Sequence, residues 1–226
     1  IKTVTISKTP SGKYYISMLV EYENQILPVI PKTFLGLDFA MHSLYVASDE
    51  DEAKYPDFLR KAEKRLAKAQ RKLSQKQKES HNREKQRLRV AILHEKVANQ
   101  RRDFLHKKAR YLADRYDVIG IEDISVKAMA KRKKGGKFSF GKSVADNGWN
   151  MFTNMLEYKL AWQGKKLIKI DKWYPSSQLC HVCGYQNHET KDLSVREWDC
   201  PKCGSHHNRD KNAAINIREE ARRISA

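Results

Sequence analysis

The pattern of hydrophobic and polar positions at the start of the chain favours two short strands. Residues 2–8 and 14–22 are rich in Val, Ile, Thr and Tyr, and Thr9-Pro10-Ser11-Gly12 between them is typical of a turn. A lone hairpin is only marginally stable in water. Because the chain begins at Ile1 rather than Met, we expect residues 1–30 to be the hairpin remnant of an upstream wedge-like domain.

Four short apolar runs farther along the chain predict buried strands. They are bounded by polar or turn-forming residues, as the strands of a buried sheet usually are. The runs cover residues 34–40, 44–47, 117–124 and 167–170. Segments with helical periodicity separate them, so the sequence predicts an α/β fold.

Apolar residues recur at three- and four-residue steps over residues 56–116, which predicts a long helical hairpin. The two apolar stripes comprise Leu59, Ala62, Leu66, Ala69 and Leu73, then Val90, Leu93, Val97 and Phe104. The polar stretch 77–83 is interpreted as the turn that joins two antiparallel helices. Amphipathic helices are also predicted at 149–162, before Gly164, and at 210–223.

The composition indicates a polyanionic partner. The 226 residues carry a formal net charge of +18, with a pI near 9.7, which is more positive charge than folding requires. Nucleic acid is the expected partner. An anionic membrane is the alternative, but no apolar run approaches the ~18 residues that would suggest a spanning helix. No targeting segment is visible, so we expect a cytoplasmic protein without a membrane partner.

Basic side chains gather on the outer faces of the helical hairpin and in one loop. The helices contain too few acids to balance these charges, which favours a phosphate-facing surface over an ordinary solvated face. Residues 127–142 are too basic to pack and contain Gly135 and Gly136, so they are interpreted as a loop. The candidate nucleic-acid contacts are Lys131, Arg132, Lys133, Lys134, Arg71, Arg101 and Arg209.

The cysteine spacing predicts a zinc site. Two C-x-x-C pairs stand sixteen residues apart, and they contain all four cysteines of the chain: Cys180, Cys183, Cys200 and Cys203. Disulfides or buried thiols are the alternative, but no secretory signal is visible and the chain is large enough to fold without them. Four thiolates fill a tetrahedral shell, so the Zn²⁺ would be structural. The nearby histidines are interpreted as surface or nucleic-acid contacts: His181, His188, His206 and His207.

Three acids stand out because of where they lie in the predicted elements. Asp38 is in the middle of an apolar strand, Glu122 is near the end of another, and Asp210 begins a helix. Carboxylates that are gathered in one place repel one another unless cations bridge them. Two Mg²⁺ or Mn²⁺ ions would relieve the repulsion and would suit hydrolysis of a phosphodiester. We therefore identify these three acids as candidate catalytic metal ligands.

Several motifs then occur in a specific order from about residue 30 to the end. They are Gly36-Leu37-Asp38-Phe39-Ala40, Ile121-Glu122-Asp123-Ile124, Tyr174-Pro175-Ser176-Ser177-Gln178, the two cysteine pairs, and Asn208-Arg209-Asp210-Lys211-Asn212. Each motif alone is weak evidence, but the order resembles the RuvC-like nuclease half of transposon-encoded TnpB proteins. These proteins are relatives of the type V CRISPR effector nucleases.

The resemblance implies a fold and a division of the chain. The fold is an α/β, RNase H-like (RuvC) mixed sheet with a long inserted helical hairpin and an inserted four-cysteine zinc ribbon. The nuclease core would cover residues 31–175, with the helical insertion at about 56–116. The zinc ribbon would cover residues 176–206, and residues 207–226 would form the final RuvC segment and its helix.

The resemblance also implies an activity. It predicts an RNA-guided DNA endonuclease that cuts phosphodiester bonds at Asp38, Glu122 and Asp210 by two-metal-ion hydrolysis, with guide RNA and target DNA as partners. The upstream half of the family, which reads the DNA next to the target, is largely missing here. Two alternatives remain: an RNA-guided DNA-binding regulator that does not cut, and an accessory transposase that joins DNA strands.

Overall fold

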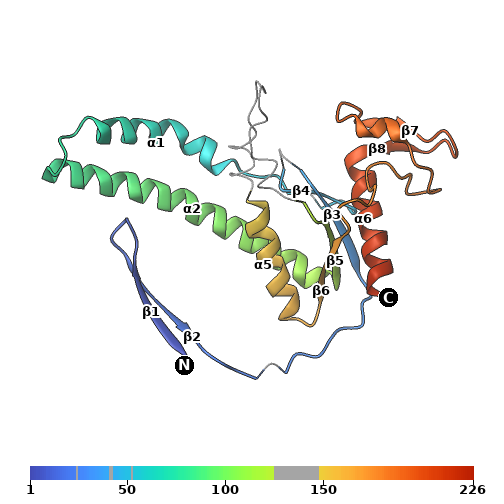
Figure 1. Ribbon diagram of the computed structural model, residues 1–226, viewed down its shortest axis with the longest axis horizontal. Coiled ribbons are helices and arrows are strands. Elements are labelled where there is room, and N and C mark those ends of the chain that lie inside the picture. The colour runs from blue at the N-terminus through green and yellow to red at the C-terminus, as the bar shows by residue number, and fades with distance from the viewer. Residues whose placement is uncertain (24, 41–42, 52, 125–147) are drawn as a thin grey trace. The chain divides into compact units, whose positions relative to one another are not determined.

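The computed structural model describes residues 1–226 except 24, 41–42, 52 and 125–147. The described residues divide into two compact units (Figure 1). One unit comprises residues 1–25 and 57–104, and the other comprises residues 26–56 and 105–226. Across these described ranges, no helix combines the length and the apolar character needed to cross a bilayer.

The first unit contains the predicted hairpin. Strands β1 (Thr3–Lys8) and β2 (Tyr14–Leu19) pair antiparallel, with Thr3 opposite Leu19 and Lys8 opposite Tyr14. The hydrogen bond from the Gly12 N–H to the Thr9 carbonyl (2.9 Å) closes the turn between them. Both faces of the hairpin are exposed. The prediction of two strands is therefore confirmed, although the second strand ends earlier than expected.

The same unit contains the predicted pair of antiparallel helices. Helix α1 spans Phe58–Ser74 and helix α2 spans His81–Arg115, whose last residues belong to the second unit. The Gln86 side chain donates to the Ala69 carbonyl (2.9 Å), and Phe58 meets Phe104 edge-to-face. The predicted apolar stripes face inward, because their members are the less exposed positions on both helices.

The second unit is built on a four-stranded mixed sheet in the order β4-β3-β5-β6. The strands are β3 (Phe34–Phe39), β4 (Tyr45–Ala47), β5 (Val118–Glu122) and β6 (Lys166–Ile170). Strand β3 pairs antiparallel with β4 and parallel with β5, and β5 pairs parallel with β6. The sequence correctly predicted all four strands. However, β6 is an edge strand with exposed lysines at 166 and 169, not the fully buried strand we expected.

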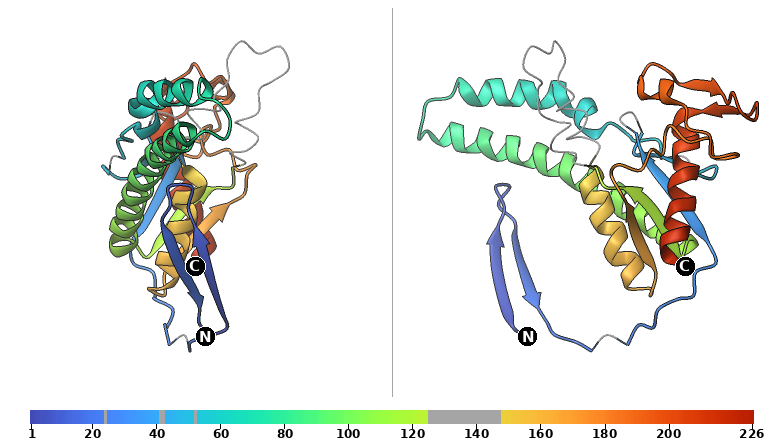
Figure 2. Two further views of the ribbon diagram at one scale, coloured as in Figure 1. Left: turned by 90° about the vertical axis from the view of Figure 1, so that its left-hand side faces the viewer. Right: turned by 45° about the vertical axis from the view of Figure 1, so that its right-hand side comes forward.

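Helices cover both faces of this sheet (Figures 1 and 2). Helix α5 (Trp149–Ala161) and helix α6 (Arg209–Ser225) lie on opposite faces. On one face, Ile217 and Ala221 of α6 pack on Val118 and Ile170. On the other, Phe152 of α5 stacks on Tyr45, with ring centroids 5.6 Å apart. Because side chains alternate along a strand, the even-numbered positions of β3 and β5 face α6.

Two glycines allow α6 to lie unusually close to the sheet. Gly36 of β3 and Gly120 of β5 are directly paired across the parallel strands. A Cβ atom on Gly36 would lie 2.0 Å from the Ala214 carbonyl oxygen, and one on Gly120 would lie 2.6 Å from the Ala221 Cβ. No other residue type fits at such distances, so this pair of glycines fixes where α6 crosses the strands.

Asp117 ties the beginnings of three strands together. One carboxylate oxygen accepts the N–H groups of Lys32 (2.9 Å) and Thr33 (3.0 Å) and the Thr33 hydroxyl (3.0 Å). The Lys165 ammonium lies 3.7 Å from the other oxygen. Partial burial opposes ionisation, but the hydrogen bonds and Lys165 outweigh it, so the pKa of Asp117 lies below its usual range.

A small strand pair that the sequence did not predict precedes α6. Strands β7 (Glu197–Asp199) and β8 (His206–Asn208) are antiparallel, and a short 3₁₀ helix, η1 (His188–Lys191), comes before them. Asn208, the last residue of β8, also caps α6, because its side chain accepts the Lys211 N–H (3.1 Å). The strand pair therefore leads directly into the helix that carries Asp210.

The Gly36→Ala variant is expected to destabilise the second unit by about 1–3 kcal/mol, because the added methyl group overlaps backbone atoms of α6. Denaturant unfolding monitored by circular dichroism measures this change. Ser17→Ala introduces the same side chain on the exposed strand β2 and should change stability by less than about 0.5 kcal/mol. A Gly36→Ala protein as stable as this control would contradict the close helix approach.

The Asp117→Asn variant is expected to lose about 1–3 kcal/mol of unfolding free energy at pH 7, since the hydrogen-bond acceptor loses its charge. Folding lowers the pKa of Asp117. Its contribution is therefore complete above the unfolded value of about 3.9, and it is lost as the pH falls through the folded value. Unfolding curves from pH 7 to pH 3 should show the difference between the proteins shrinking. A difference independent of pH would refute the proposed charge effect.

Candidate functional site

Two of the three candidate acids lie side by side on neighbouring parallel strands. Leu37 of β3 pairs with Ile121 of β5, so Asp38 and Glu122 are the next pair in register. Strands in a sheet lie about 4.8 Å apart, and paired residues point to the same face. Asp38 and Glu122 are even-numbered positions of β3 and β5, like Gly36 and Gly120. Both carboxylates therefore project from the face that α6 covers.

The third acid comes from the first turn of α6. Asp210 precedes by one helical turn Ala214, whose carbonyl lies over Gly36, and the helix therefore begins beside Asp38. Burial raises the pKa of Asp38 well above its usual range, the charges of Glu122 and Asp210 raise it further, and Arg209 opposes them. The structure thus brings the three acids into one electrostatic environment, although they are far apart in sequence.

Two side chains from residues 176–206, the cysteine-bearing segment, each contact one of these acids. The Ser176 hydroxyl donates to the Glu122 carboxylate. The Arg196 guanidinium lies 3.3 Å from an oxygen of Asp210. The same segment is joined to α6 through its backbone, since the Arg209 N–H donates to the Arg196 carbonyl (2.8 Å). Neither Ser176 nor Arg196 was predicted to act on the acids.

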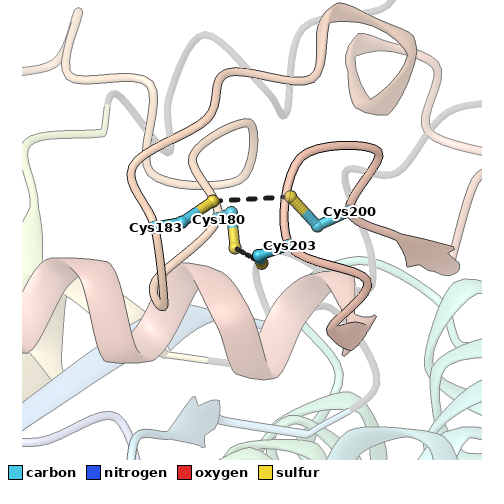
Figure 3. Close-up of side chains that lie close together, drawn as sticks. All are labelled: Cys180, Cys183, Cys200 and Cys203. Carbon is cyan, nitrogen blue, oxygen red and sulfur yellow. Dashed lines mark hydrogen bonds between the residues drawn. The ribbon is translucent and has the colours of Figure 1, made fainter.

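The four cysteines form a compact cluster of free thiols (Figure 3). The sulfurs of Cys180 and Cys203 lie 3.6 Å apart, as do those of Cys183 and Cys200, and all four lie within 4.8 Å of one another. A disulfide requires about 2.05 Å. A tetrahedral zinc with 2.3 Å bonds separates its sulfurs by about 3.8 Å. The cluster therefore fits one Zn²⁺ ion rather than two disulfides.

Among the residues that the structure describes, this is the only group of three or more potential ligands placed so closely. The three carboxylates are less tightly gathered, since Glu122 and Asp210 are each turned toward a protein partner. The cysteines thus form a closed site with four donors. The acids form a second, more open group.

His207 supports the cysteine cluster, although the sequence suggested a surface role for it. It is almost fully buried, its Nε2 lies 3.1 Å from the Cys180 sulfur, and its ring packs on Trp198 and His181. A ring nitrogen placed in this way orients a metal-binding thiolate. The surface interpretation of His207 is therefore wrong. The sequence of β8, His-His-Asn, is polar throughout and carries no signal that only its middle residue is buried.

Two asparagines on α6 connect the cysteine cluster to the acids. Asn212 accepts the His181 N–H (3.1 Å) and donates to the Leu179 carbonyl (2.6 Å). One turn later, Asn216 donates to the carbonyls of Ser176 and Leu179, both at 2.7 Å. Both asparagines are buried. Asn212 belongs to a motif that the sequence singled out, but only the fold reveals this clamp.

Three of the seven candidate nucleic-acid contacts lie among the described residues. Arg209 adjoins the acids, and its Nε is buried without a hydrogen-bond partner in the described ranges. Arg71 is exposed in the last turn of α1, and Arg101 is half-buried on α2. Lys131, Arg132, Lys133 and Lys134 lie outside the described residues. Binding by any of these side chains stays a prediction.

Two stretches of the chain match known protein families. Residues 17–133, more than half of the chain, match the OrfB_IS605 family, described as a probable transposase. Residues 149–217 match the TNB domain of Cas12f1-like proteins. The second match includes the four cysteines and Asp210.

Curated relatives match over nearly the whole chain. Two are named "Putative RNA-guided DNA endonuclease". One, from Streptomyces pristinaespiralis, is 40% identical over 95% of this chain and 52% of its own length. The other, InsQ from Escherichia coli K12, is 35% identical over 96% and 56%. The CRISPR-associated endodeoxyribonuclease Cas12f1 of Sulfoacidibacillus thermotolerans is 27% identical over 91% and 50%. The chain thus spans about half the length of these relatives.

Solved structures share the fold. A chain from the cryo-EM structure of a Cas12f1–sgRNA–target DNA complex gives a TM-score of 0.55 at 20% identity, over 95% of this chain and 55% of that one. A chain from a CRISPR-Cas12f ternary complex gives 0.52 at 20% identity, over 95% and 44%. Both likenesses support the mixed α/β fold.

The Cys180→Ser variant is expected to lose bound zinc and to unfold residues 176–206, because structural zinc contributes about 10 kcal/mol or more to the folding of small modules. Metal analysis of the purified protein gives the zinc content, and limited proteolysis reports local unfolding. Val182→Ser is a matched control, since Val182 lies between the first two cysteines and is exposed. Equal zinc content in the two variants would contradict a four-thiolate site.

Proposed function

This chain belongs to the OrfB_IS605 family of probable transposases, the TnpB family, and on that basis we propose that it supplies the nuclease half of an RNA-guided DNA endonuclease. Relatives named as putative RNA-guided DNA endonucleases align with nearly all of the chain. Guide RNA and target DNA are the proposed partners of the whole protein. The net charge of +18 suits both partners, because phosphate contacts dominate the affinity for nucleic acids.

We propose that the second unit contains an RNase H-like (RuvC) core, formed by residues 31–175 without the helical insertion and completed by residues 207–226. The mixed sheet with one antiparallel edge strand, and acids at the ends of β3 and β5, support this assignment. Residues 176–206 would form an inserted zinc ribbon, which the four-cysteine cluster supports. Residues 1–30 would belong to a wedge-like domain outside this core, which the exposed hairpin of β1 and β2 supports.

The observation that carries the proposal is the position of three acids: Asp38 and Glu122 are adjacent in register on β3 and β5, and the first turn of α6, which contains Asp210, begins beside Asp38. Their mutual repulsion fits a site for two divalent cations, Mg²⁺ or Mn²⁺. When bound, such ions activate a water molecule and stabilise the leaving oxygen of a phosphodiester. The sheet register fixes the backbone of Asp38 and Glu122, and the position of α6 fixes the backbone of Asp210, so the three candidate ligands start from neighbouring elements.

Other residues of the chain orient these ligands. Ser176 donates to Glu122, which fixes the rotamer of that carboxylate. Arg196 does the same for Asp210 from the cysteine-bearing segment. Arg209 would meet a phosphate of the substrate near Asp38, which its buried Nε, without a hydrogen-bond partner in the described ranges, supports. Lys131, Arg132, Lys133, Lys134, Arg71 and Arg101 would also contact the nucleic-acid backbone.

The cleavage rate of the Asp38→Ala variant is expected to fall at least about a thousandfold. This is the scale expected when a lost metal ligand removes several kcal/mol of transition-state stabilisation. The assay incubates the protein with its guide RNA, Mg²⁺ and a matched DNA target. Asp123→Ala is the control, because Asp123 directly follows Glu122 but is exposed; this variant should retain activity. Tight binding without cuts in the wild-type protein would favour a regulator. Joined DNA products would favour a transposase.

A further inference from the structure

A short loop begins and ends at the candidate catalytic acid Glu122. Strand β6 ends at Ile170, which pairs in register with Glu122. Six residues later, the Ser176 hydroxyl donates to the Glu122 carboxylate. Residues 171–175 therefore form a loop that is closed at both ends on one metal-ligand candidate.

Trp173 lies at the middle of this loop and is 79% exposed. Its backbone is fixed: the Trp173 N–H donates to the Asp171 carboxylate (2.7 Å), and the Tyr174 N–H donates to the Asp171 carbonyl (3.0 Å). The ring of Tyr174 packs against the core beneath α6. The loop thus presents a large apolar ring to solvent on a rigid support.

The charge beside the ring narrows the choice of ligand. The Lys172 ammonium lies 4.9 Å from the centroid of the Trp173 ring, and Lys172 is exposed. An exposed indole next to an ammonium group, at the edge of a site for phosphodiesters, matches a nucleotide: the ring stacks on the base and the lysine meets a phosphate. An apolar protein surface would not require the lysine.

Stacking on the Trp173 ring also indicates whether the bound nucleic acid is paired or unpaired. Bases in a duplex are already stacked on their neighbours, so an indole gains little there, whereas an unpaired base offers a free face. We propose that Trp173 is a stacking platform that holds an unpaired base of the substrate strand beside Asp38, Glu122 and Asp210. This inference rests on the proposed function, and it adds a residue that positions the substrate at that site.

Trp162 provides an internal comparison. It is also exposed, at 58%, but it packs on Tyr158 with ring centroids 4.6 Å apart. It follows α5 and precedes Lys166, where β6 starts, so it lies near the opposite end of that strand from Glu122. A general role of exposed tryptophans in binding would involve both residues. A role tied to the acids would involve Trp173 alone.

The test measures binding of the 226-residue chain to three probes of equal length, without added divalent metal: single-stranded oligothymidine, the same strand with every base removed, and a duplex. The Trp173→Ala variant should bind oligothymidine at least about fivefold more weakly than wild type, the scale of one lost stacking contact. Its affinity for the abasic strand and for the duplex should be unchanged. Trp173→Phe should recover most of the loss, and Trp162→Ala should bind like wild type.

An equal loss on the abasic strand or on the duplex would overturn the stacking platform, as would a Phe variant as weak as the Ala variant. Unchanged binding to all three probes would overturn it as well. Cleavage by the wild-type protein is a separate measurement. If the whole protein with its guide RNA fails to cut a matched target, the proposed function is wrong, whereas the binding result still tests the platform. If Trp173→Ala cuts single strands with an unchanged KM, only the platform is wrong.

Discussion

The close contact between α6 and the central sheet is the constraint on which the candidate site depends. Gly36 and Gly120 stand at the same level of two adjacent strands, and the backbone of α6 occupies the space where their side chains would be. Atoms at such short range leave a helix little freedom to slide or tilt. The first turn of α6 is therefore held next to Asp38, and the position of Asp210 follows from packing several residues away.

Helix α6 contacts both the cysteine-bearing segment and the acids, so the positions of the two groups are coupled. Asn212 and Asn216 bind the backbone around Leu179, between Ser176 and the first cysteine. On the other side, Arg196 reaches Asp210. A segment that leaves the sheet after β6 and returns at α6 loses much conformational freedom, and a metal ion bound by the four cysteines would offset that cost. Order in the cysteine-bearing segment thus supports the acids, although none of its cysteines belongs to them.

The sequence predicted the long elements and the three acids, because these features are local. Two stripes of apolar residues suffice to predict α1 and α2, and an acid within an apolar strand is visible without a structure. The roles of Asn212 and His207 depend on contacts with residues about 30 positions away, which leave no periodic signal. Strands of three residues, such as β7 and β8, are too short for a period to be recognised.

The alternation of side chains along β3 and β5 explains how residues far apart in the sequence are brought to one face of the sheet. A slip of one residue in β3 would place Leu35 or Leu37 under α6 and turn Asp38 toward the opposite face. Neither leucine fits in the space where the Ala214 carbonyl lies 2.0 Å from the missing Cβ of Gly36. The glycine therefore excludes the wrong register, and the right register brings Asp38 beside Glu122. The same steric rule that positions the helix thus also selects the face on which the acids meet.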